Sequence, residues 1–307
     1  MNNILEVETL KKSFKSVAAV RGISFSIAPG EVFAFLGPNG AGKTTTLRIL
    51  LDIIKADQGA IRWNLNGKIA SLPDPSLLGY LPEERGLYLD LPVIRILVYL
   101  ASIRGMHPAD ARVAAMEWLE RLELADRAKE KLQALSKGNQ QKVQFVAAIL
   151  HKPAFAILDE PFSGLDPINQ EKFIEYIQEI NRQGTTVLLS SHQMSLVERV
   201  ARKVFLLHKG QEVFYGSLTD IYKNHGQQHS LDLTFNGQLP LDALEQLEGN
   251  EFVEQEDDHR VKVRFAPGRD LNKILGQIAQ LEGLANVKSQ NSSLHDIYLN
   301  MVKKKDI

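Results

Sequence analysis

Residues 37–44 (GPNGAGKT) combine the residue types that hold phosphate groups, and they fit the pattern G-x-x-x-x-G-K-[ST]. The glycines let the backbone turn its N–H groups inward around a polyanion, and a helix that begins there adds its positive end. We expect Lys43 to reach the terminal phosphates of a nucleotide and the Thr44 hydroxyl to ligate Mg²⁺. The other residues of this predicted phosphate loop are Gly37, Pro38, Asn39, Gly40, Ala41 and Gly42.

The acidic pair Asp159-Glu160 follows the apolar run Phe155–Leu158, which is typical of a buried strand. A carboxylate at a strand end beside a phosphate loop supplies a second anchor for Mg²⁺. We therefore expect Asp159 to hold the metal through water and Glu160 to activate the attacking water. On its own the pair equally fits an acidic surface turn, and only the phosphate loop favours the chemical role.

Two further segments are candidates for contact with the same nucleotide. Ser136 and Gly138 open a helix, and a helix N-terminus binds anions, although an ordinary cap by Ser136 is the alternative. His192 follows the strand-like segment Thr186–Ser190, which places it at a strand end on the same edge. A lone histidine at such a place is usually structural, so His192 depends on the other motifs for a functional interpretation.

The phosphate loop lies between elements that suit its chemistry. The apolar run 31–36 precedes it, and residues 45–54 carry apolar side chains at helical spacing. A glycine-rich turn with a chance lysine is disfavoured because both flanking elements are in place.

Strands and helices alternate over residues 1 to about 225. Pro29-Gly30 and Lys209-Gly210 indicate the turns of two hairpins. The pattern of residues 90–150 predicts a mostly helical insert. We interpret its amphipathic stripe of apolar side chains as core packing. The remaining predicted strands are Ile4–Thr9, Ser24–Ile27, Val32–Leu36, Val204–His208 and Glu212–Tyr215.

A second domain is expected over residues 228–307, after a short polar stretch at 222–229. Its pattern is β-α-β-β-α-β with a terminal helix, which predicts a small α+β domain of the ferredoxin-like type. It carries more acidic than basic residues, which disfavours nucleic-acid binding. Gating of activity, dimerisation and ligand sensing all remain open as roles for it.

The composition is that of an ordinary globular protein. The 307 residues are enough for a sizeable core and predict two domains. They are 44% hydrophobic and 24% charged, which is incompatible with a mainly disordered chain. The net charge of −1 gives no general attraction to nucleic acid. The absence of cysteine excludes disulfides and thiolate metal sites. We find no apolar stretch long enough to span a bilayer and no signal-peptide core.

Taken in order, these motifs resemble the ATP-binding subunits of ABC transporters over residues 1 to about 225. The resemblance implies a P-loop NTPase fold of the α/β class, with a mixed sheet core, N-terminal antiparallel hairpins and a helical subdomain at about 90–150. The segments that carry it are GPNGAGKTT at 37–45, LSKGNQQ at 135–141, FAILDEP at 155–161, SGLD at 163–166 and SSH ending at His192.

The resemblance implies a role for each matching residue of the nucleotide site. Gly37 to Thr45 would cradle the phosphates of ATP, and Thr44 and Asp159 would hold Mg²⁺. The implied catalytic residues are Lys43, Glu160 as the general base and His192 on the γ-phosphate.

Other matching residues imply an ATP site shared between two subunits. The signature residues Ser136, Lys137, Gly138 and Asn139 would complete the site of the opposite subunit, and Asp166 would link the two halves. Phe14 falls where the family stacks an aromatic ring on adenine, and burial in the core is the alternative for it.

Two departures from the family pattern stand out. Lys137 replaces the first of two glycines in the signature, while Gly138 is kept. Glu83 stands where the family has glutamine, and its carboxylate would be repelled by ATP unless it ligates Mg²⁺ or is neutralised by a cation such as Arg85. Glu83 is therefore a further candidate metal ligand. The segment GYLPEERGLY at 79–88 and the C-terminal 293–299 most resemble the sodium-efflux and drug-export branch.

The resemblance also implies partners and a place in the cell. The chain would act as a homodimer or beside a related ATP-binding subunit, on separate integral membrane subunits, at the inner face of the cell membrane, and without nucleic acid. One alternative is a soluble ATPase of translation or DNA repair with the same core. Another is a module that binds ATP without hydrolysing it, which the intact Asp159-Glu160 pair and His192 disfavour.

Overall fold

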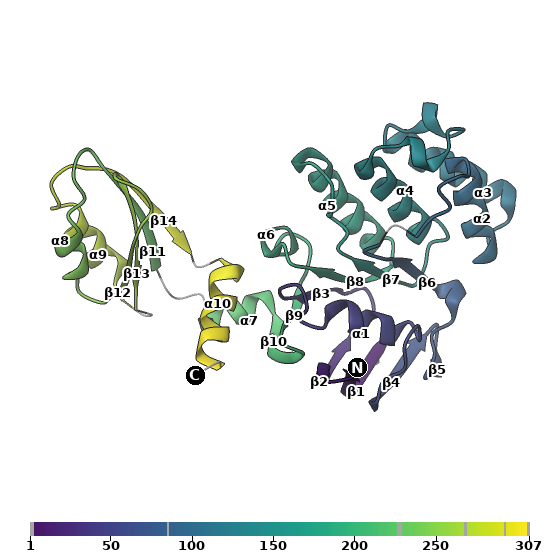
Figure 1. The fold of residues 1–307 in the computed structure, drawn as a ribbon, viewed down its shortest axis with the longest axis horizontal. Helices are drawn as coiled ribbons and strands as arrows, with labels where there is room; N and C mark the ends of the chain where they lie inside the picture. Colours follow the sequence, from purple (N-terminus) through teal and green to yellow (C-terminus); the bar gives the residue numbers. More distant parts are fainter. Residues whose placement is uncertain (1–2, 85, 226–228, 267–268, 292, 306–307) are drawn as a thin grey trace. The chain divides into compact units, whose positions relative to one another are not determined.

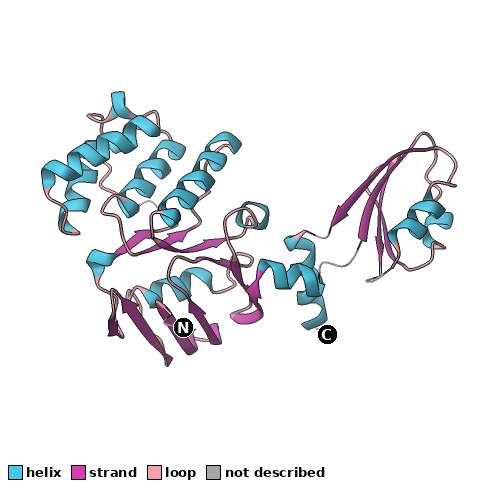
Figure 2. Ribbon diagram, turned by 180° about the vertical axis from the view of Figure 1, so that it is seen from behind, coloured by secondary structure: helices cyan, strands magenta, loops and turns pink. Residues whose placement is uncertain are grey.

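The computed structural model describes residues 3–84, 86–225, 229–266, 269–291 and 293–305. They form two compact units, Met1–Gly216 and Ser217–Ile307 (Figures 1 and 2). The division falls slightly before the polar stretch 222–229, so helix α7 (Leu218–His225) belongs to the second unit. None of the described helices is long and apolar enough to cross a lipid bilayer.

The first unit is built around a six-stranded sheet in the order β10-β9-β3-β8-β7-β6. The five strands from β9 to β6 in that order are parallel, so their carboxyl ends meet along one edge. The central strands β3, β7 and β8 are buried along their whole length, as expected for strands covered on both faces. The bounds are β3 Val32–Leu36, β6 Leu78–Leu81, β7 Phe155–Asp159, β8 Thr186–Ser191, β9 Lys203–His208 and β10 Gln211–Ser217.

An antiparallel sheet, in the order β2-β1-β4-β5, packs against this core. Phe25 of this sheet lies edge-on to Phe35 at 5.0 Å, and Trp63 lies edge-on to Phe155 at 5.0 Å. Helix α1 (Lys43–Leu50) fills the layer between the two sheets (Figure 1). The bounds are β1 Leu5–Phe14, β2 Val17–Ile27, β4 Gln58–Leu65 and β5 Lys68–Ala70.

The other face of the six-stranded sheet carries α4 and α5, on the side away from α1 (Figure 1). Helices α2, α3 and α4 fall within the region 90–150 that the sequence predicts to be helical. The bounds are α2 Val93–Ile103, α3 Pro108–Arg121, α4 Lys137–Ile149, α5 Pro167–Arg182 and the short α6 Met194–Val197.

Two features of the first unit differ from the sequence predictions. The predicted hairpin at Pro29-Gly30 is wrong, because β2 and β3 on either side of it lie in different sheets. Lys209-Gly210 does join neighbouring strands, and both residues have positive φ, 47° and 79°, as a tight two-residue turn requires. We did not predict β4, β5 and β6, which are short or largely exposed.

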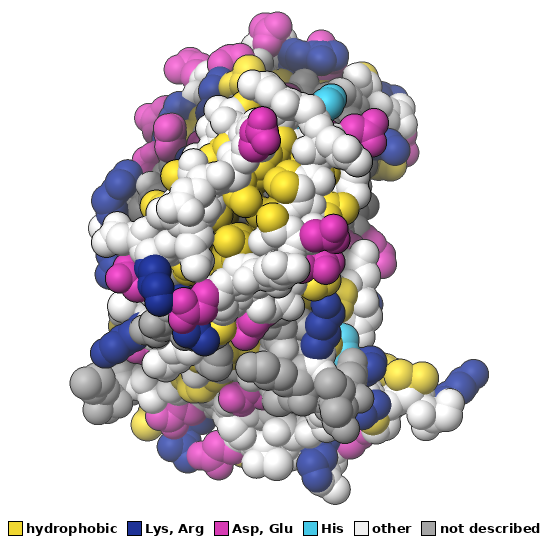
Figure 3. Space-filling view, turned by 90° about the vertical axis from the view of Figure 1, so that its left-hand side faces the viewer, with side chains coloured by type: hydrophobic (Ala, Val, Ile, Leu, Met, Phe, Trp, Pro, Cys, Tyr) yellow, Lys and Arg dark blue, Asp and Glu magenta, His cyan; other side chains and the backbone are white. Residues whose placement is uncertain are grey.

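The second unit has the predicted order of elements, β-α-β-β-α-β and a terminal helix. Its sheet, in the order β12-β13-β11-β14, is antiparallel throughout, and the ferredoxin-like assignment stays a prediction. Helices α8 and α9 pack on one face of this sheet, and the apolar side chains of the resulting core are buried, among them Leu231, Val263 and Phe265. Figure 3, which faces the side where α8 and α9 are labelled in Figure 1, shows a strip of hydrophobic side chains on this side. The bounds are β11 His229–Phe235, α8 Leu241–Glu245, β12 Asn250–Gln255, β13 Arg260–Phe265, α9 Leu271–Ile278, β14 Leu284–Asn291 and α10 Leu294–Lys305.

Gly79 lets helix α4 approach strand β6 closely. A Cβ atom at Gly79 would lie 2.2 Å from the backbone oxygen of Ala148, nearer than any side chain can be placed. This nearest atom belongs to the backbone, and the next, Pro153 Cγ at 3.0 Å, belongs to a proline ring, so neither can rotate away. The contact fixes the height at which α4 lies over the end strand of the sheet.

We predict that Gly79→Ala destabilises the first unit by about 1–3 kcal/mol, because an inserted methyl group must push the α4 backbone away. Both tryptophans, Trp63 and Trp118, belong to this unit, so their fluorescence follows its thermal unfolding alone. Each kcal/mol should lower the midpoint by about 2–4 °C. Gly86→Ala is the matched control, since a Cβ there meets no atom within 4 Å. Equal midpoints for the two variants would contradict the proposed contact.

Candidate active site

The phosphate loop joins β3 to α1, as the sequence predicts, and it is packed tightly from two sides. A Cβ at Gly37 would lie 2.3 Å from the oxygen of Leu207, and one at Gly42, where φ is 105°, would lie 2.4 Å from the oxygen of Ala19. The Gly210 N–H also donates to the Ala41 carbonyl at 3.0 Å. Neighbouring backbone therefore fixes the loop's shape.

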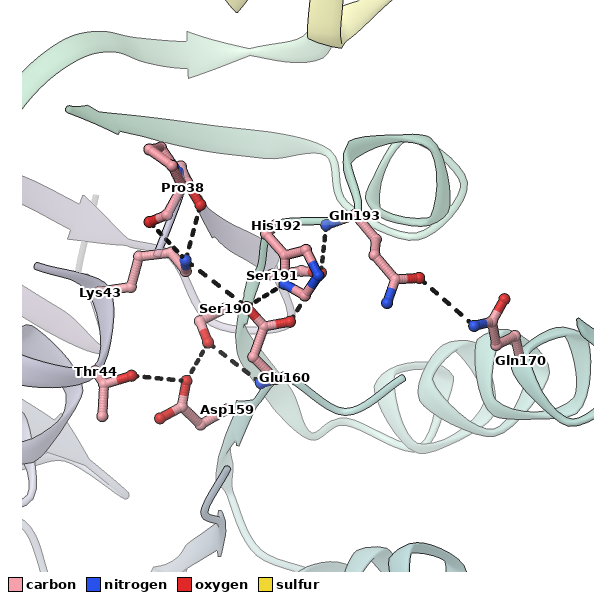
Figure 4. A network of polar contacts seen from close by, with 11 residues as sticks. Pro38, Lys43, Thr44, Asp159, Glu160, Gln170, Ser190, Ser191, His192 and Gln193 are labelled. Carbon is pink, nitrogen blue, oxygen red and sulfur yellow. Dashed lines mark hydrogen bonds and ion pairs between the residues drawn. The ribbon is translucent and has the colours of Figure 1, made fainter. Parts of the chain in front are cut away.

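Lys43 is buried inside this loop, with 6% of its surface exposed. Its ammonium donates hydrogen bonds to the carbonyl oxygens of Gly37 at 2.7 Å and Pro38 at 3.2 Å, and it lies 3.7 Å from Glu160 Oε1 (Figure 4). The loop thus holds one cation at the centre of its curve, next to the carboxylate of Glu160, the residue that follows β7.

Asp159, the last residue of β7, is fully buried. Its Oδ1 accepts hydrogen bonds from the hydroxyls of Ser190 and, at 3.4 Å, Thr44 (Figure 4). Its Oδ2 has no hydrogen-bond partner among the described residues. Burial raises the pKa of the Asp159 carboxyl; the two hydrogen bonds oppose this, while the charges of Glu83 and Glu160 add to it. A carboxylate with a buried, unbonded oxygen beside a threonine hydroxyl is suited to a hard divalent cation.

Glu160 begins the loop after β7 in a left-handed conformation, with φ 49°. Its N–H contacts the Ser190 carbonyl at 3.1 Å and the Ser190 hydroxyl at 3.3 Å. Its Oε2 accepts from the Ser191 hydroxyl at 3.4 Å, and its Oε1 lies 3.0 Å from His192 Nδ1. The strand end of β8 therefore orients a carboxylate that is only 5% exposed.

Ser190 and Ser191 act in this arrangement through hydroxyl groups to which sequence reasoning assigned no role. Ser191 also accepts from the N–H of Gln193 at 3.0 Å, and the Gln193 side chain lies 3.5 Å from that of Gln170 on α5 (Figure 4). The only signal in the sequence was two polar residues at the end of an apolar strand.

Five predicted residues thus meet at one edge of the sheet, and they come from two strand ends, those of β7 and β8, and from the start of helix α1. They are Lys43, Thr44, Asp159, Glu160 and His192. Because β3, β7 and β8 are adjacent and parallel, their carboxyl ends deliver these side chains to one place.

The signature residues lie on a separate element. Ser136 caps α4, since its hydroxyl accepts from the Asn139 N–H at 3.3 Å, and Lys137 is exposed. A Cβ at Gly138 would lie 3.1 Å from the Gly164 oxygen. The described contacts do not join this segment to Lys43 or Glu160. Asp166 caps α5 in the same way, accepting from the Asn169 N–H at 2.9 Å.

Phe14 and Glu83 are both exposed. Phe14 ends β1 with 46% of its surface exposed, so core burial, the alternative from the sequence, is wrong; its ring lies 5.5 Å from Lys12 Nζ. Glu83 follows β6, and the next residue, Glu84, lies 3.6 Å from Arg48. Arg85, our candidate for neutralising Glu83, lies outside the described residues.

Comparison with known proteins relates this chain to one family. The "ABC transporter" family model matches residues 20–163. The uncharacterized ABC transporter ATP-binding protein YhaQ of Bacillus subtilis is 38% identical, over 97% of this chain and 98% of its own. The linearmycin resistance ATP-binding protein LnrL of the same species is 32% identical, over 76% of each chain.

A solved structure described as the ATP-binding subunit of an ABC transporter has the same fold over most of this chain. It is 31% identical, covers 73% of this chain and 93% of its own, and superposes with a TM-score of 0.65. Together with the nearly full-length match to YhaQ, this likeness establishes the family. The chain belongs to the ATP-binding subunits of ABC transporters, a family that binds nucleotide, hydrolyses ATP and works with membrane subunits.

Proposed function

We propose that this chain binds ATP at the carboxyl edge of the six-stranded sheet and that Glu160 is the general base for its hydrolysis. The observation that carries the proposal is the meeting of one buried cation and two buried carboxylates at a phosphate loop. Lys43, in contact with loop carbonyls, is placed to turn toward the terminal phosphates, where charge-assisted hydrogen bonds are strong. The loop residues Gly37 to Thr45 would hold the remaining phosphate oxygens.

Mg²⁺ would be held by Thr44 and Asp159, with Glu83 as a further candidate. The unbonded Oδ2 of Asp159 supports this choice. No group of three or more His, Cys, Asp and Glu suited to a metal occurs in the described part of the chain, so phosphate oxygens would complete the coordination. When bound, the ion would neutralise charge on the terminal phosphates.

The proposed reaction needs a proton acceptor that is fixed in place. Glu160 would take the proton of the water that attacks the γ-phosphorus, as the bond to the ADP oxygen breaks. The hydroxyl of Ser191 holds one carboxylate oxygen, and His192 lies beside the other. Because the His192 side chain is about half exposed, at 48%, it is placed to contact the γ-phosphate from the solvent side.

We further propose that two subunits share each ATP. Ser136, Lys137, Gly138 and Asn139 form a helix start whose first residues are exposed, and a helix N-terminus attracts phosphate. They would complete the nucleotide site of the opposite subunit, with Asp166 at the same interface. Phe14, exposed at the end of β1, would stack on the adenine ring.

The partners would be integral membrane subunits, bound at the inner face of the cell membrane. A mainly apolar groove of about 380 Å³ supports this, because Ile53 and Leu72 in its wall are 57% and 52% exposed. LnrL carries a drug-resistance name, which favours export of a drug-like compound. Na⁺, the other candidate, rests on the sequence resemblance of residues 79–88 and 293–299 alone. The transporter names of the relatives disfavour the alternative of a soluble ATPase in translation or repair.

Replacing Glu160 by Gln tests the general base. The Glu160→Gln protein should still bind ATP, because the amide fits the same space, but it should hydrolyse ATP about 10²–10⁴-fold more slowly. ATP should then hold two subunits together, which light scattering with and without nucleotide measures. Glu175→Gln, at an exposed position on α5, is the matched control. Normal turnover by Glu160→Gln would show that another group is the base.

Replacing Lys43 by Ala tests the phosphate site. Loss of charge-assisted hydrogen bonds to phosphate should weaken ATP binding about 10–100-fold, as measured by calorimetry with Mg²⁺ present. Lys55→Ala should bind normally, because Lys55 is exposed and pairs with Asp52 at the surface. Unchanged affinity in Lys43→Ala would refute the assigned site.

A further inference from the structure

The segment from Leu78 to Glu84 lies along helix α4 and is attached to it at several points. The His151 Nε2–H, just after the helix, donates to the Leu78 carbonyl at 2.9 Å. Gly79 lies against the Ala148 oxygen, as described above. One turn earlier, Gln144 Nε2 donates to the carbonyls of Pro82 at 2.9 Å and Glu84 at 3.1 Å. The strand and the loop after it are thus fixed to one face of α4.

Gln144 is an unusual residue for its position. It is 97% buried, with 3% of its surface exposed, next to the fully buried Val143 and Phe145. A buried amide costs free energy unless its hydrogen bonds are made, and both N–H groups of Gln144 are used. Their acceptors are the two carbonyls on either side of Glu83. A single side chain therefore fixes the backbone through which Glu83 is presented.

The same helix contacts the catalytic side of the molecule. Gln141, three residues before Gln144, is 2% exposed and donates to the Pro161 carbonyl at 3.2 Å, directly after Glu160. At the first turn, Gly138 lies close to the Gly164 oxygen. Helix α4 thus joins three segments: the signature, the loop after the general base, and the loop of Glu83.

We infer that Gln144 is a positioning residue for Glu83, which locks the Glu83 loop to α4 so that loop and signature move as one body. The inference rests on the proposed function, in which Glu83 lies near the metal and the signature acts on the second ATP. Gln144 touches neither nucleotide nor metal, and it would act only through the backbone of Pro82–Glu84. A push on this loop by a membrane partner would then reach the signature residues without passing through Glu160.

Hydrogen–deuterium exchange of the full chain tests the attachment without nucleotide. Gln144→Met keeps the length of the side chain and removes both donors, so peptides covering Leu78–Glu84 should exchange about tenfold faster. Gln144→Glu, which also lacks the donors, is a second variant in case the first folds poorly. Gln140→Met is the matched control, because its amide also donates to two carbonyls, those of Leu132 and Leu135, away from this loop. Unchanged exchange in both Gln144 variants would overturn the inference.

A double-mutant cycle separates positioning from general support. We expect Gln144→Met to raise the Mg²⁺ concentration for half-maximal ATP hydrolysis about tenfold, and to change it less than twofold when Glu83→Ala is already present. Equal effects in both backgrounds would show that Gln144 does not act through Glu83. Failure of the wild-type chain to bind or hydrolyse ATP would instead refute the proposed function, while the exchange experiment would still decide whether Gln144 holds the loop.

Discussion

Two adjacent carboxylates, Asp159 and Glu160, are buried at the end of one strand. The elements around them are arranged so that each carboxylate has partners that replace water. Burying an ion costs several kcal/mol unless hydrogen bonds and opposite charges replace its water, so each must be supplied with partners. Lys43 provides a positive charge 3.7 Å from Glu160, and the serine hydroxyls of β8 provide donors. One oxygen of Asp159 is left without a described donor, and this incomplete compensation suits the site to a cation.

The partners come from elements that are distant in sequence, which is why the parallel sheet matters. β3 leads into the phosphate loop, β7 ends in the acidic pair, and β8 ends in the serines, and the three are neighbours. Close backbone contacts at Gly37 and Gly42 hold the loop against β9 and β2. Precise placement therefore depends on the packing of the two sheets as much as on the motif residues themselves.

Most of the sheet core could be predicted because strong local patterns specify it. Val32–Leu36 is an unbroken apolar run, and the structure confirms its bounds. β6, of only four residues, has no such pattern and exists because β7 and α4 flank it. Pro29-Gly30 has the composition of a hairpin turn, yet the chain passes from one sheet to the other there. The path is determined by tertiary packing, which the local sequence does not reveal. The hydrogen bonds of Gln144 were equally hidden, since their acceptors are carbonyls 60 residues away or more in sequence.

At Glu160 the left-handed backbone lowers the stability of the fold, while the side chain is the one that we propose for catalysis. A side chain other than glycine in that conformation costs about 1–2 kcal/mol, which glycine would recover. Replacing Glu160 by glycine would thus stabilise the fold and at the same time remove the carboxylate that we propose as the general base. A glutamate that persists here in other lineages would be a sign of selection for turnover, and a glycine would be a sign that a lineage had stopped using the site as an enzyme.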